Sequence, residues 1–196
     1  MATFLLLRHA QSTWNAERRW QGWADAPLSE EGERQAELAG RRLRGEVLTA
    51  AASSDLRRAR RTAELISQSL DLGPVGVERG LRERDVGEWS GLTAEEVDER
   101  WPGQREAWRT GRLNAPPGGE STPVLIERVL EALRKLATAA DPTERLLVVT
   151  HGGVIRALEI HVGLHPRGVP VVSGRWFGLE GAKLLPGDAV AVGDME

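Results

Sequence analysis

The stretch FLLLRHAQSTWN, residues 4–15, places four apolar residues directly before Arg8 and His9. A short continuous apolar run of this kind is typical of a strand that is covered on both faces, as in a parallel sheet. Two basic side chains at its end predict a polar site where the strand leaves the core. How specific this prediction is depends on which other strands end in the same way.

Two other predicted strands also run into polar side chains. Residues 47–52 form a candidate strand that leads into the sequence SSD, and Arg58 lies one turn into the helix that follows. The stretch RLLVVT, residues 145–150, is the clearest buried strand and leads into His151. Ligands of open α/β sheets bind beyond the carboxyl ends of the strands. If these three strands are neighbours, two histidines and two arginines meet in one pocket, which would repel itself unless it held an anion.

Helical patterns alternate with these strands. One helix is predicted to begin at Ser29, where three glutamates in the first turn favour the helix dipole. A second covers LRRARRTAELISQSL, residues 56–70, and has apolar residues at alternating spacings of three and four. In this helix Arg58 lies beside the buried stripe and not on the charged face. A third helix follows Ser121, and a fourth begins near Val154.

Strands that alternate with helices predict an α/β fold, a three-layer α/β/α sandwich with a mostly parallel central sheet. Residues 75–78 add a short strand, and residues 171–192 add two or three β segments. Residues 81–120 are expected to form loops and short helices. Because no linker or internal repeat divides the sequence, we expect a single domain over residues 1–196.

The composition excludes several functional classes. The chain of 196 residues carries a net charge of −3, which argues against a nucleic-acid-binding protein. It contains no cysteine, so disulfides and thiolate chemistry are excluded. No apolar run approaches the roughly 20 residues that a membrane span needs, and FLLL is too short for a signal peptide. We therefore expect a cytoplasmic protein without membrane contact. The spacing of the four histidines matches no metal motif, so no metal site is expected.

The pair Gly152–Gly153 directly after His151 strengthens the prediction of an anion site. A strand, a glycine turn and a helix N-terminus expose backbone N–H groups to a bound phosphate. A neutral imidazole beside that phosphate can attack phosphorus if a hydrogen bond orients its other nitrogen. Arg8 and Arg58 would then bind the phosphoryl oxygens and stabilise their charge during transfer.

The leaving alcohol also needs a proton donor. Glu83 in GLRERDVGEWSG is a candidate, because it follows the short strand and precedes a glycine-containing turn. Asp85 and Glu88 are competitors, and their spacing alone does not choose among the three.

Taken together, these segments resemble the histidine phosphatase superfamily, which is phosphoglycerate mutase-like in fold. The matching motifs are LLRHAQSTWN, SSDLRRARRTAE, LRERDVGEWSG and VVTHGGVIR, and the loop WQGWADAPLSEEGERQA is similar to the substrate-proximal loop of the family. They occur in the family's order and cover most of the chain. The first motif departs from the pattern at Ala10, where glycine is usual, and only slight crowding is expected there.

The resemblance implies a mechanism that needs no metal or other cofactor. His9 would accept the phosphoryl group, Glu83 would protonate the leaving oxygen and later activate water, and Asn15 would contribute its side-chain amide. The groups that hold the phosphoryl oxygens would be Arg8, Arg58 and His151. Further substrate-binding positions would be Gln21, Gly22 and Gly152.

Three functions remain open at this point. A phosphatase lets water attack the phosphohistidine, whereas a cofactor-dependent phosphoglycerate mutase returns the phosphoryl group to its substrate. The short chain and the motif RERDVGEWSG favour a phosphomonoester phosphatase of broad specificity. A phosphate-binding protein without turnover is the third alternative. The expected partner is a small phosphorylated metabolite, such as a sugar phosphate, phosphoglycerate or α-ribazole phosphate. A homodimer through the apolar C-terminal strands is compatible with the sequence.

Overall fold

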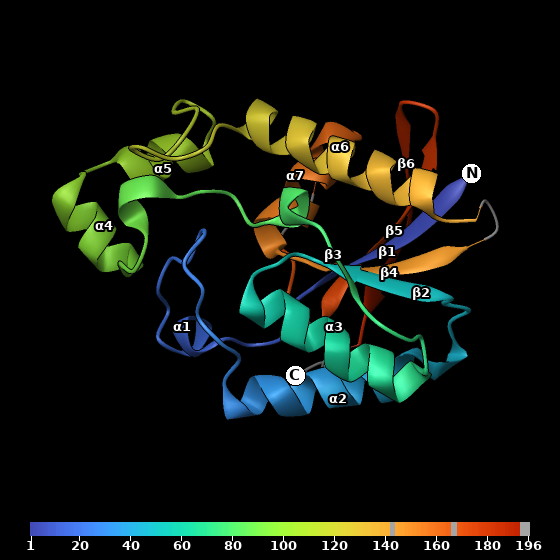
Figure 1. The fold of residues 1–196 in the computed structure, drawn as a ribbon. Helices are drawn as coiled ribbons and strands as arrows, with labels where there is room; N and C mark the ends of the chain where they lie inside the picture. The colour runs from blue at the N-terminus through green and yellow to red at the C-terminus, as the bar shows by residue number, and fades with distance from the viewer. Residues whose placement is uncertain (142–143, 166–167, 193–196) are drawn as a thin grey trace.

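In the computed structural model, which describes residues 1–141, 144–165 and 168–192, six strands form one sheet (Figure 1). The strands are β1 (Ala2–Arg8), β2 (Ala50–Ser53), β3 (Gly76–Val77), β4 (Arg145–Thr150), β5 (Ser173–Glu180) and β6 (Lys183–Ala191). Their order across the sheet is β3-β2-β4-β1-β5-β6. Strands β1, β4, β2 and β3 run parallel, whereas β5 and β6 are antiparallel to their neighbours. This confirms the prediction of a mostly parallel sheet and places β1, β4 and β2 side by side.

Helices cover both faces of the sheet. The helices are α1 (Thr13–Ala16), α2 (Glu30–Arg42), α3 (Arg57–Leu70), α4 (Ala94–Arg100), α5 (Gln104–Arg109), α6 (Thr122–Ala139) and α7 (Gly152–His161), with 3₁₀ turns at Leu43–Gly45, Arg79–Leu81 and Gly87–Trp89. Figure 1 shows α2 and α3 on one face and α6 and α7 on the other, which is the predicted three-layer arrangement. None of the described helices combines the length and apolar character needed to cross a membrane.

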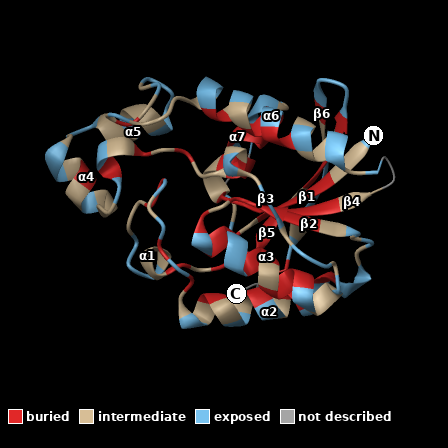
Figure 2. Cartoon of the chain, in the orientation of Figure 1, coloured by how far each residue is buried: buried red, intermediate tan, exposed pale blue. Residues whose placement is uncertain are grey.

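The alternation of side chains along β1 explains why its apolar run is unbroken. Phe4 and Leu6 pack into the cluster under α6 and α7, while Leu5 and Leu7 pack into the cluster under α2 and α3. All four are fully buried, and Figure 2 shows β1 drawn mainly in the colour of buried residues. Successive side chains of a strand point to opposite faces, so a strand that lies between two helical layers needs apolar residues at every position.

The second strand lies further along the chain than predicted. Strand β2 begins at Ala50 and not at residue 47, and Val47 is 65% exposed. Glu46 and Leu48 belong to a turn, in which Glu46 N donates to Leu43 O and Leu48 N donates to Glu46 O. Pairing with β4 starts only where Ala50 meets Leu146. The apolar residues before it are therefore the connection from α2.

Other predicted boundaries are also adjusted. The strand expected over residues 75–78 is reduced to Gly76–Val77 at the sheet edge. Helix α7 begins at Gly152, two residues before the predicted start, because the glycines form its first turn and His151 occupies the N-cap position. Ser29 caps α2 as predicted, since its Oγ accepts a hydrogen bond from Gly32 N (3.0 Å). Ser121 occupies the N-cap position of α6, but its side chain makes no capping hydrogen bond.

Residues 81–120 form a smaller layer of short helices beside the sheet, in agreement with the prediction. Trp20, Trp89 and Trp108 pack together there, with ring centroids 5.5–5.6 Å apart. Trp89 is fully buried, and Val86 and Val97 belong to the same apolar cluster. The tryptophan cluster fixes α4 and α5 close to the carboxyl ends of the parallel strands (Figure 1).

Candidate active site

The carboxyl ends of β1, β4 and β2 bring four basic side chains together. His9 directly follows β1 and His151 directly follows β4, and His9 N donates a hydrogen bond to Thr150 O (3.0 Å). The two imidazole rings lie 5.2 Å apart between centroids. Arg58, in the first turn of α3 after β2, donates from Nε to His9 Nε2 (3.2 Å). The adjacency of the three strands thus produces the cluster that the sequence predicts.

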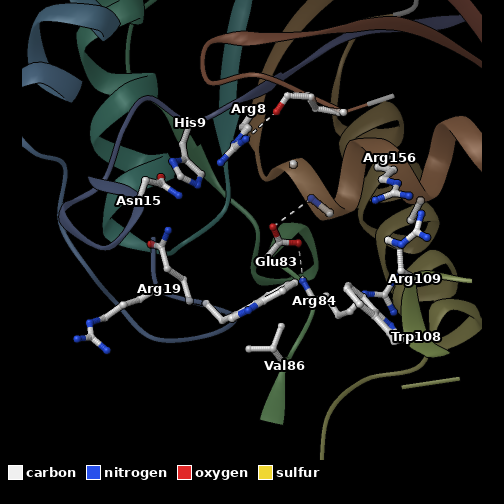
Figure 3. Close-up of a pocket in the computed structure, with 18 of the residues that line it drawn as sticks. Arg8, His9, Asn15, Arg19, Glu83, Arg84, Val86, Trp108, Arg109 and Arg156 are labelled. Carbon is white, nitrogen blue, oxygen red and sulfur yellow. Dashed lines mark hydrogen bonds between the residues drawn. The ribbon is translucent and has the colours of Figure 1, made fainter. Parts of the chain in front are cut away.

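His9 is held in one tautomer by its own backbone. Its Nδ1 lies 2.6 Å from the carbonyl oxygen of Ala10, which can only accept, so Nδ1 carries the hydrogen. The lone pair is then on Nε2, and the Arg58 contact at that atom is consistent with this assignment. The His9 side chain lines a cavity of about 680 Å³ (Figure 3). An imidazole held in this way presents an unprotonated nitrogen to a ligand.

Both histidines are neutral over the physiological pH range. Burial lowers the pKa of His9 and of His151 well below 6.5, and the charges of Arg58 and Arg8 lower both pKa values further. Neither ring nitrogen of His151 has a hydrogen-bond partner among the described residues. His151 is fully buried and is not among the residues that line the cavity, and its ring packs edge-on against that of His9, which does line it.

Ala10 fits the turn in which glycine was expected. The described residues with positive φ do not include it, so its backbone does not require glycine. The residue is fully buried, and its N–H donates to Thr62 Oγ1 (3.1 Å). The substitution therefore leaves the geometry of the β1 end intact.

The two arginines are fixed by backbone carbonyls. Arg58 donates from Nη1 to Ala24 O (2.7 Å) and from Nη2 to Gly22 O (2.9 Å), and Arg8 donates from Nη1 to Val169 O (2.7 Å). Burial lowers the pKa of Arg58 to about 10 and also lowers that of Arg8. Both side chains line the cavity and remain cations at neutral pH. Each guanidinium is therefore pre-positioned to bind an anion.

Arg58 is neither paired with Asp55 nor hydrogen-bonded to Glu83, the two carboxylates that lie near it in the predicted motifs. A pair with Asp55 is excluded, since that carboxylate is bound by both Nε and Nη2 of Arg82 (2.8 and 2.6 Å). Glu83 raises the pKa of Arg58 through its charge but makes no hydrogen bond to it.

Glu83 projects into the cavity across from His9 (Figure 3). Its Oε2 accepts from Gly153 N (3.1 Å) and its Oε1 accepts from Arg84 N (2.8 Å). The competitors Asp85 and Glu88 do not line the cavity, and Asp85 Oδ1 instead accepts from Gly87 N. Of the three acids, Glu83 is therefore the one that lines the cavity.

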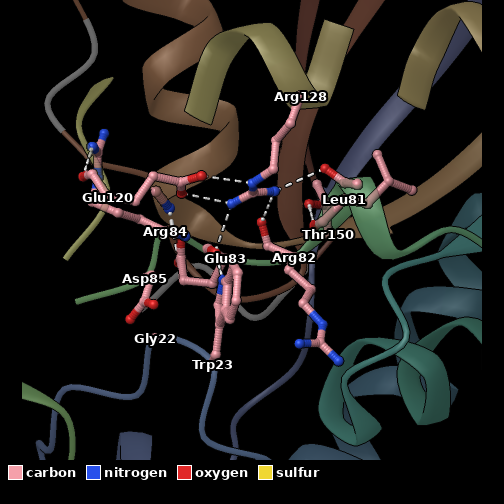
Figure 4. A network of polar contacts seen from close by, with 12 residues as sticks. Gly22, Trp23, Leu81, Arg82, Glu83, Arg84, Asp85, Glu120, Arg128 and Thr150 are labelled. Carbon is pink, nitrogen blue, oxygen red and sulfur yellow. Dashed lines mark hydrogen bonds and ion pairs between the residues drawn. The ribbon is translucent and has the colours of Figure 1, made fainter. Parts of the chain in front are cut away.

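The segment that carries Glu83 is held by an arginine from α6. Arg128 donates to the carbonyl oxygens of Gly80, Arg82 and Glu83, at 2.8–2.9 Å (Figure 4). Its charge is paired with Glu120, which is 8% exposed. Thr150 Oγ1 also donates to Leu81 O and Trp23 Nε1 to Glu83 O, both at 2.8 Å. These bonds fix the backbone on both sides of the carboxylate.

The predicted substrate-binding residues all line the cavity. Asn15 Oδ1 and Gln21 Oε1 lie 3.0 and 2.8 Å from the Ser12 hydroxyl, which fixes both amides. Gly22 has φ +52, a conformation that favours glycine, and its carbonyl anchors Arg58. Gly152 lies against Arg8, and a Cβ at this position would be 3.2 Å from Arg8 Cδ.

Several basic residues of the wall are not among the predicted site residues. They are Arg18, Arg19, Arg84, Arg109 and Arg156. Trp20 and Trp108 also line this wall. Arg156 is different, because it comes from α7, one turn after Gly152–Gly153. That helical spacing is the signal in the sequence that points to it. Within the described residues, no group of three His, Cys, Asp or Glu could hold a metal ion.

Comparisons with known proteins agree with this geometry. The profile of the histidine phosphatase superfamily (branch 1) matches residues 4–173. The glucosyl-3-phosphoglycerate phosphatase of Mycolicibacterium vanbaalenii is 37% identical, over 97% of this chain and 89% of that protein. The 2,3-bisphosphoglycerate-dependent phosphoglycerate mutase of Methylobacterium radiotolerans is 39% identical, over 79% of this chain and 76% of the mutase.

A solved structure is also similar over almost the whole chain. The mycobacterial glucosyl-3-phosphoglycerate phosphatase in complex with VO3 superposes with a TM-score of 0.85 at 32% identity. The match covers 97% of this chain and 100% of that one.

Proposed function

The chain belongs to branch 1 of the histidine phosphatase superfamily and is a phosphomonoesterase of that family's type, and we propose that its nucleophile is His9. The observation that carries the assignment is the tautomer of His9. Its Nδ1–H donates to Ala10 O, so the lone pair is on Nε2, which accepts from Arg58 Nε and belongs to a residue that lines the cavity together with Arg8 and Arg58. A desolvated, neutral imidazole of this kind can attack phosphorus without first losing a proton.

In the first step, His9 Nε2 forms a bond to phosphorus while the bond from phosphorus to the ester oxygen breaks. Glu83, in its protonated form, gives its proton to the leaving alcohol. Arg8 and Arg58 bind the phosphoryl oxygens and stabilise the charge that spreads over them, and Asn15 adds its amide. His151, whose ring packs against that of His9, is the further group proposed to hold these oxygens.

In the second step, the Glu83 carboxylate accepts a proton from water as that water attacks the phosphohistidine. The bond between phosphorus and Nε2 breaks, inorganic phosphate leaves, and both His9 and Glu83 return to their starting states. The backbone bond from Gly153 N keeps the same carboxyl group in place for both steps.

The mutase is the second candidate, because phosphoglycerate mutases are among the similar proteins. The two activities share the phosphohistidine and differ in whether water or a substrate hydroxyl receives the phosphoryl group. The short chain and the segment around Glu83 support the phosphatase. The substrate is a small phosphorylated metabolite, and we propose phosphoglycerate esters as the first class to test, since two of the similar proteins are glucosyl-3-phosphoglycerate phosphatases. A cytoplasmic location and a homodimer stay predictions.

The test is release of inorganic phosphate from p-nitrophenyl phosphate with a chelator present, together with trapping of the phosphorylated protein by rapid quenching. We expect turnover and a phosphohistidine that maps to His9. The His9→Ala variant should lose activity by more than about a thousandfold, as expected for loss of a nucleophile. The matched control is His161→Ala, which removes an exposed histidine from the end of α7.

Three outcomes would contradict the proposal. Efficient interconversion of 3- and 2-phosphoglycerate without phosphate release would identify a mutase. Binding without a trapped phosphohistidine would identify a phosphate-binding protein. Unchanged turnover in His9→Ala would remove the nucleophile assignment.

A further inference from the structure

Trp23 lies in the loop that also holds Arg58, and a large part of its side chain is open to solvent. It is 38% exposed, whereas Trp89 of the tryptophan cluster is fully buried. An indole that stays partly in water gains little free energy from burial, so its contacts have to fix its position. Its Nε1 donates to Glu83 O (2.8 Å), and its ring centroid lies 5.3 Å from the guanidinium carbon of Arg82. Both contacts are to the segment that carries the proposed proton donor.

The two neighbours of this indole in the sequence bind the opposite side of the site. Gly22 O accepts from Arg58 Nη2 (2.9 Å), and Ala24 O accepts from Arg58 Nη1 (2.7 Å). The same guanidinium donates from Nε to His9 Nε2 (3.2 Å). A stretch of three consecutive residues therefore connects the arginine beside His9 with the backbone of Glu83.

The loop also packs directly on the Glu83 segment. A Cβ at Gly22 would lie 2.7 Å from Val86 Cγ2 and 3.0 Å from Val86 N, so the two stretches of backbone are in close contact there. Asp55 binds Arg82 through both carboxylate oxygens (2.8 and 2.6 Å), and the guanidinium fixed in this way attracts the face of the indole ring. The indole is thus held in the orientation in which its N–H reaches the Glu83 carbonyl.

Helices α6 and α7 hold Glu83 independently of this loop. Arg128 of α6 donates to its carbonyl oxygen (2.9 Å), and Gly153 N of α7 donates to its carboxylate (3.1 Å). Figure 4 shows Arg128 and Trp23 on opposite sides of Glu83. The helices therefore set the position of Glu83 relative to the sheet, while the indole N–H sets it relative to Arg58.

We propose that Trp23 is a positioning residue, whose indole N–H fixes the Glu83 segment relative to Arg58 and His9 so that proton donor and nucleophile reach the same ester. This inference rests on the proposed function, because it takes Glu83 as the group that protonates the leaving oxygen. A general acid has to lie within hydrogen-bond reach of that oxygen, and a displacement of about 1 Å reduces its contribution. Trp23 is not among the residues that line the cavity, so it acts through Glu83.

Trp23→Phe tests the role of the N–H, because it removes the donor and keeps an aromatic ring beside Arg82. Phosphorylation of His9 by an alkyl phosphate, measured in a single turnover, should slow by about threefold to tenfold, the value of one neutral hydrogen bond. With p-nitrophenyl phosphate, whose leaving group needs little protonation, the change should stay below about twofold. A merely structural role would slow both substrates equally.

The same substitution in a Glu83→Gln background is the decisive measurement. Because the indole acts through the carboxyl group, Trp23→Phe should not slow the alkyl phosphate further once that group is lost. Trp101→Phe is the matched control and should leave both rates unchanged. Trp101 packs against the tryptophan cluster, does not line the cavity, and makes no indole hydrogen bond to the described residues. An equal loss with and without Glu83, or a wild-type rate in Trp23→Phe, would overturn the proposal.

Amide hydrogen exchange gives a second readout that does not depend on turnover. The Gly153 N–H lies in the first turn of α7, where its partner is the Glu83 carboxylate. In Trp23→Phe this amide should exchange about threefold to tenfold faster, and in Trp101→Phe at the wild-type rate. Faster exchange in a protein that hydrolyses no phosphomonoester would remove the proposed function and retain the positioning role. Wild-type exchange in Trp23→Phe would overturn the positioning role whatever the activity.

Discussion

At the scale of single residues, the site depends on which groups carry a proton. The Ala10 carbonyl fixes the hydrogen of His9 on Nδ1, and burial keeps the ring neutral. Glu83 lies across the cavity, where it can give a proton to one oxygen and take one from another. In the proposed mechanism, His9 is a nucleophile that needs no deprotonation. Glu83 donates a proton in the first step and accepts one in the second.

Glu83→Gln should slow phosphorylation of His9 more for esters with a strongly basic leaving group than for esters with a weakly basic one. Loss of a general acid costs roughly 10²- to 10⁴-fold when the leaving oxygen is strongly basic, as in an alkyl phosphate. The weakly basic p-nitrophenolate needs little protonation, so phosphorylation of His9 by p-nitrophenyl phosphate should be much less affected. Single-turnover phosphorylation rates for both substrates check this. Equal losses for both would contradict a proton-donor role.

The buried histidines also predict how stability depends on pH. Their pKa values are lower in the folded protein than in the unfolded chain, so the unfolded chain binds more protons below about pH 6.5. The free energy of unfolding should be insensitive to both histidines above pH 7 and should fall as the pH is lowered from 6.5. The slope approaches about 1.4 kcal/mol per pH unit for each histidine.

Urea unfolding between pH 5 and 7.5 measures this dependence. His151→Gln removes one of the two groups, so its slope should be shallower by about one proton. The control variant Val47→Ala, at an exposed position without a titratable group, should retain the wild-type slope. A wild-type slope in His151→Gln would show that this ring is not held neutral.

At the scale of elements, the turn from β4 into α7 positions two groups of the candidate site with residues that are adjacent in sequence. It ends the strand at His151 and presents the Gly153 N–H to Glu83. A helix N-terminus is an environment that favours an anionic group. The same turn therefore orients a histidine and a carboxylate that come from distant parts of the sequence.

Gly153→Ala should displace the Glu83 carboxylate and leave the rest of the fold unchanged. A Cβ here would lie 2.3 Å from Glu83 Oε1, so the carboxylate has to leave the N–H. The helical backbone itself accepts alanine. We expect kcat for an alkyl phosphate to fall by roughly 10²-fold, which is at the low end of the rate enhancement that a general acid contributes. The circular dichroism spectrum should remain that of the folded protein. Gly45→Ala is the control, because nothing lies within 4 Å of its Cβ position. Wild-type kcat in Gly153→Ala would contradict the role of this contact.

The Arg128–Glu120 pair joins α6 to the segment that carries Glu83. Arg128→Leu leaves Glu120, which is 8% exposed, as an unpaired charge, and we expect a loss of about 3–5 kcal/mol in the free energy of unfolding. Replacing both residues by leucine should cost less than Arg128→Leu alone. Urea unfolding of the two single variants and the double variant measures the coupling. Additive losses would show that the pair is not coupled.

At the scale of the whole molecule, the strand order decides that a site exists. β4 lies between β1 and β2, so the ends of all three strands meet at one edge of the sheet. The covering helices bury the strands on both faces. The catalytic geometry is therefore tied to the packing of the central sheet.

Leu147→Ala tests that packing. Leu147 is fully buried on β4 and pairs with Leu5 and Ala51 of the neighbouring strands. Its truncation should lower the free energy of unfolding by about 2–5 kcal/mol. Val47→Ala, at a residue 65% exposed, should change it by no more than about 0.5 kcal/mol. Urea denaturation measures both, and equal effects would contradict the assignment of Leu147 to the core.

How accurately the sequence predicts a strand or a site residue depends on how completely that segment is buried. Residues 145–150 were predicted correctly, because the four residues between Arg145 and Thr150 are all apolar and are buried on both faces of the sheet. The strand over residues 47–52 was misplaced, since apolar residues in a turn look like strand residues until the partner strand is known. The motifs predict that His9, Arg58, Glu83 and His151 come together, and the structure places His9, Arg58 and His151 in contact and Glu83 on the same cavity as His9. Arg156 was missed, because an arginine on a helix is usually a solvent-exposed residue.

The tryptophan cluster provides an intrinsic fluorescence signal for ligand binding in the cavity. The chain contains seven tryptophans and no tyrosine, so its ultraviolet-excited emission comes from indole rings alone. Trp20 and Trp108 lie both in the cluster and on the cavity wall. An anion bound in the cavity alters the field at these two indoles, so occupancy of the cavity can be followed by fluorescence titration on the unlabelled protein.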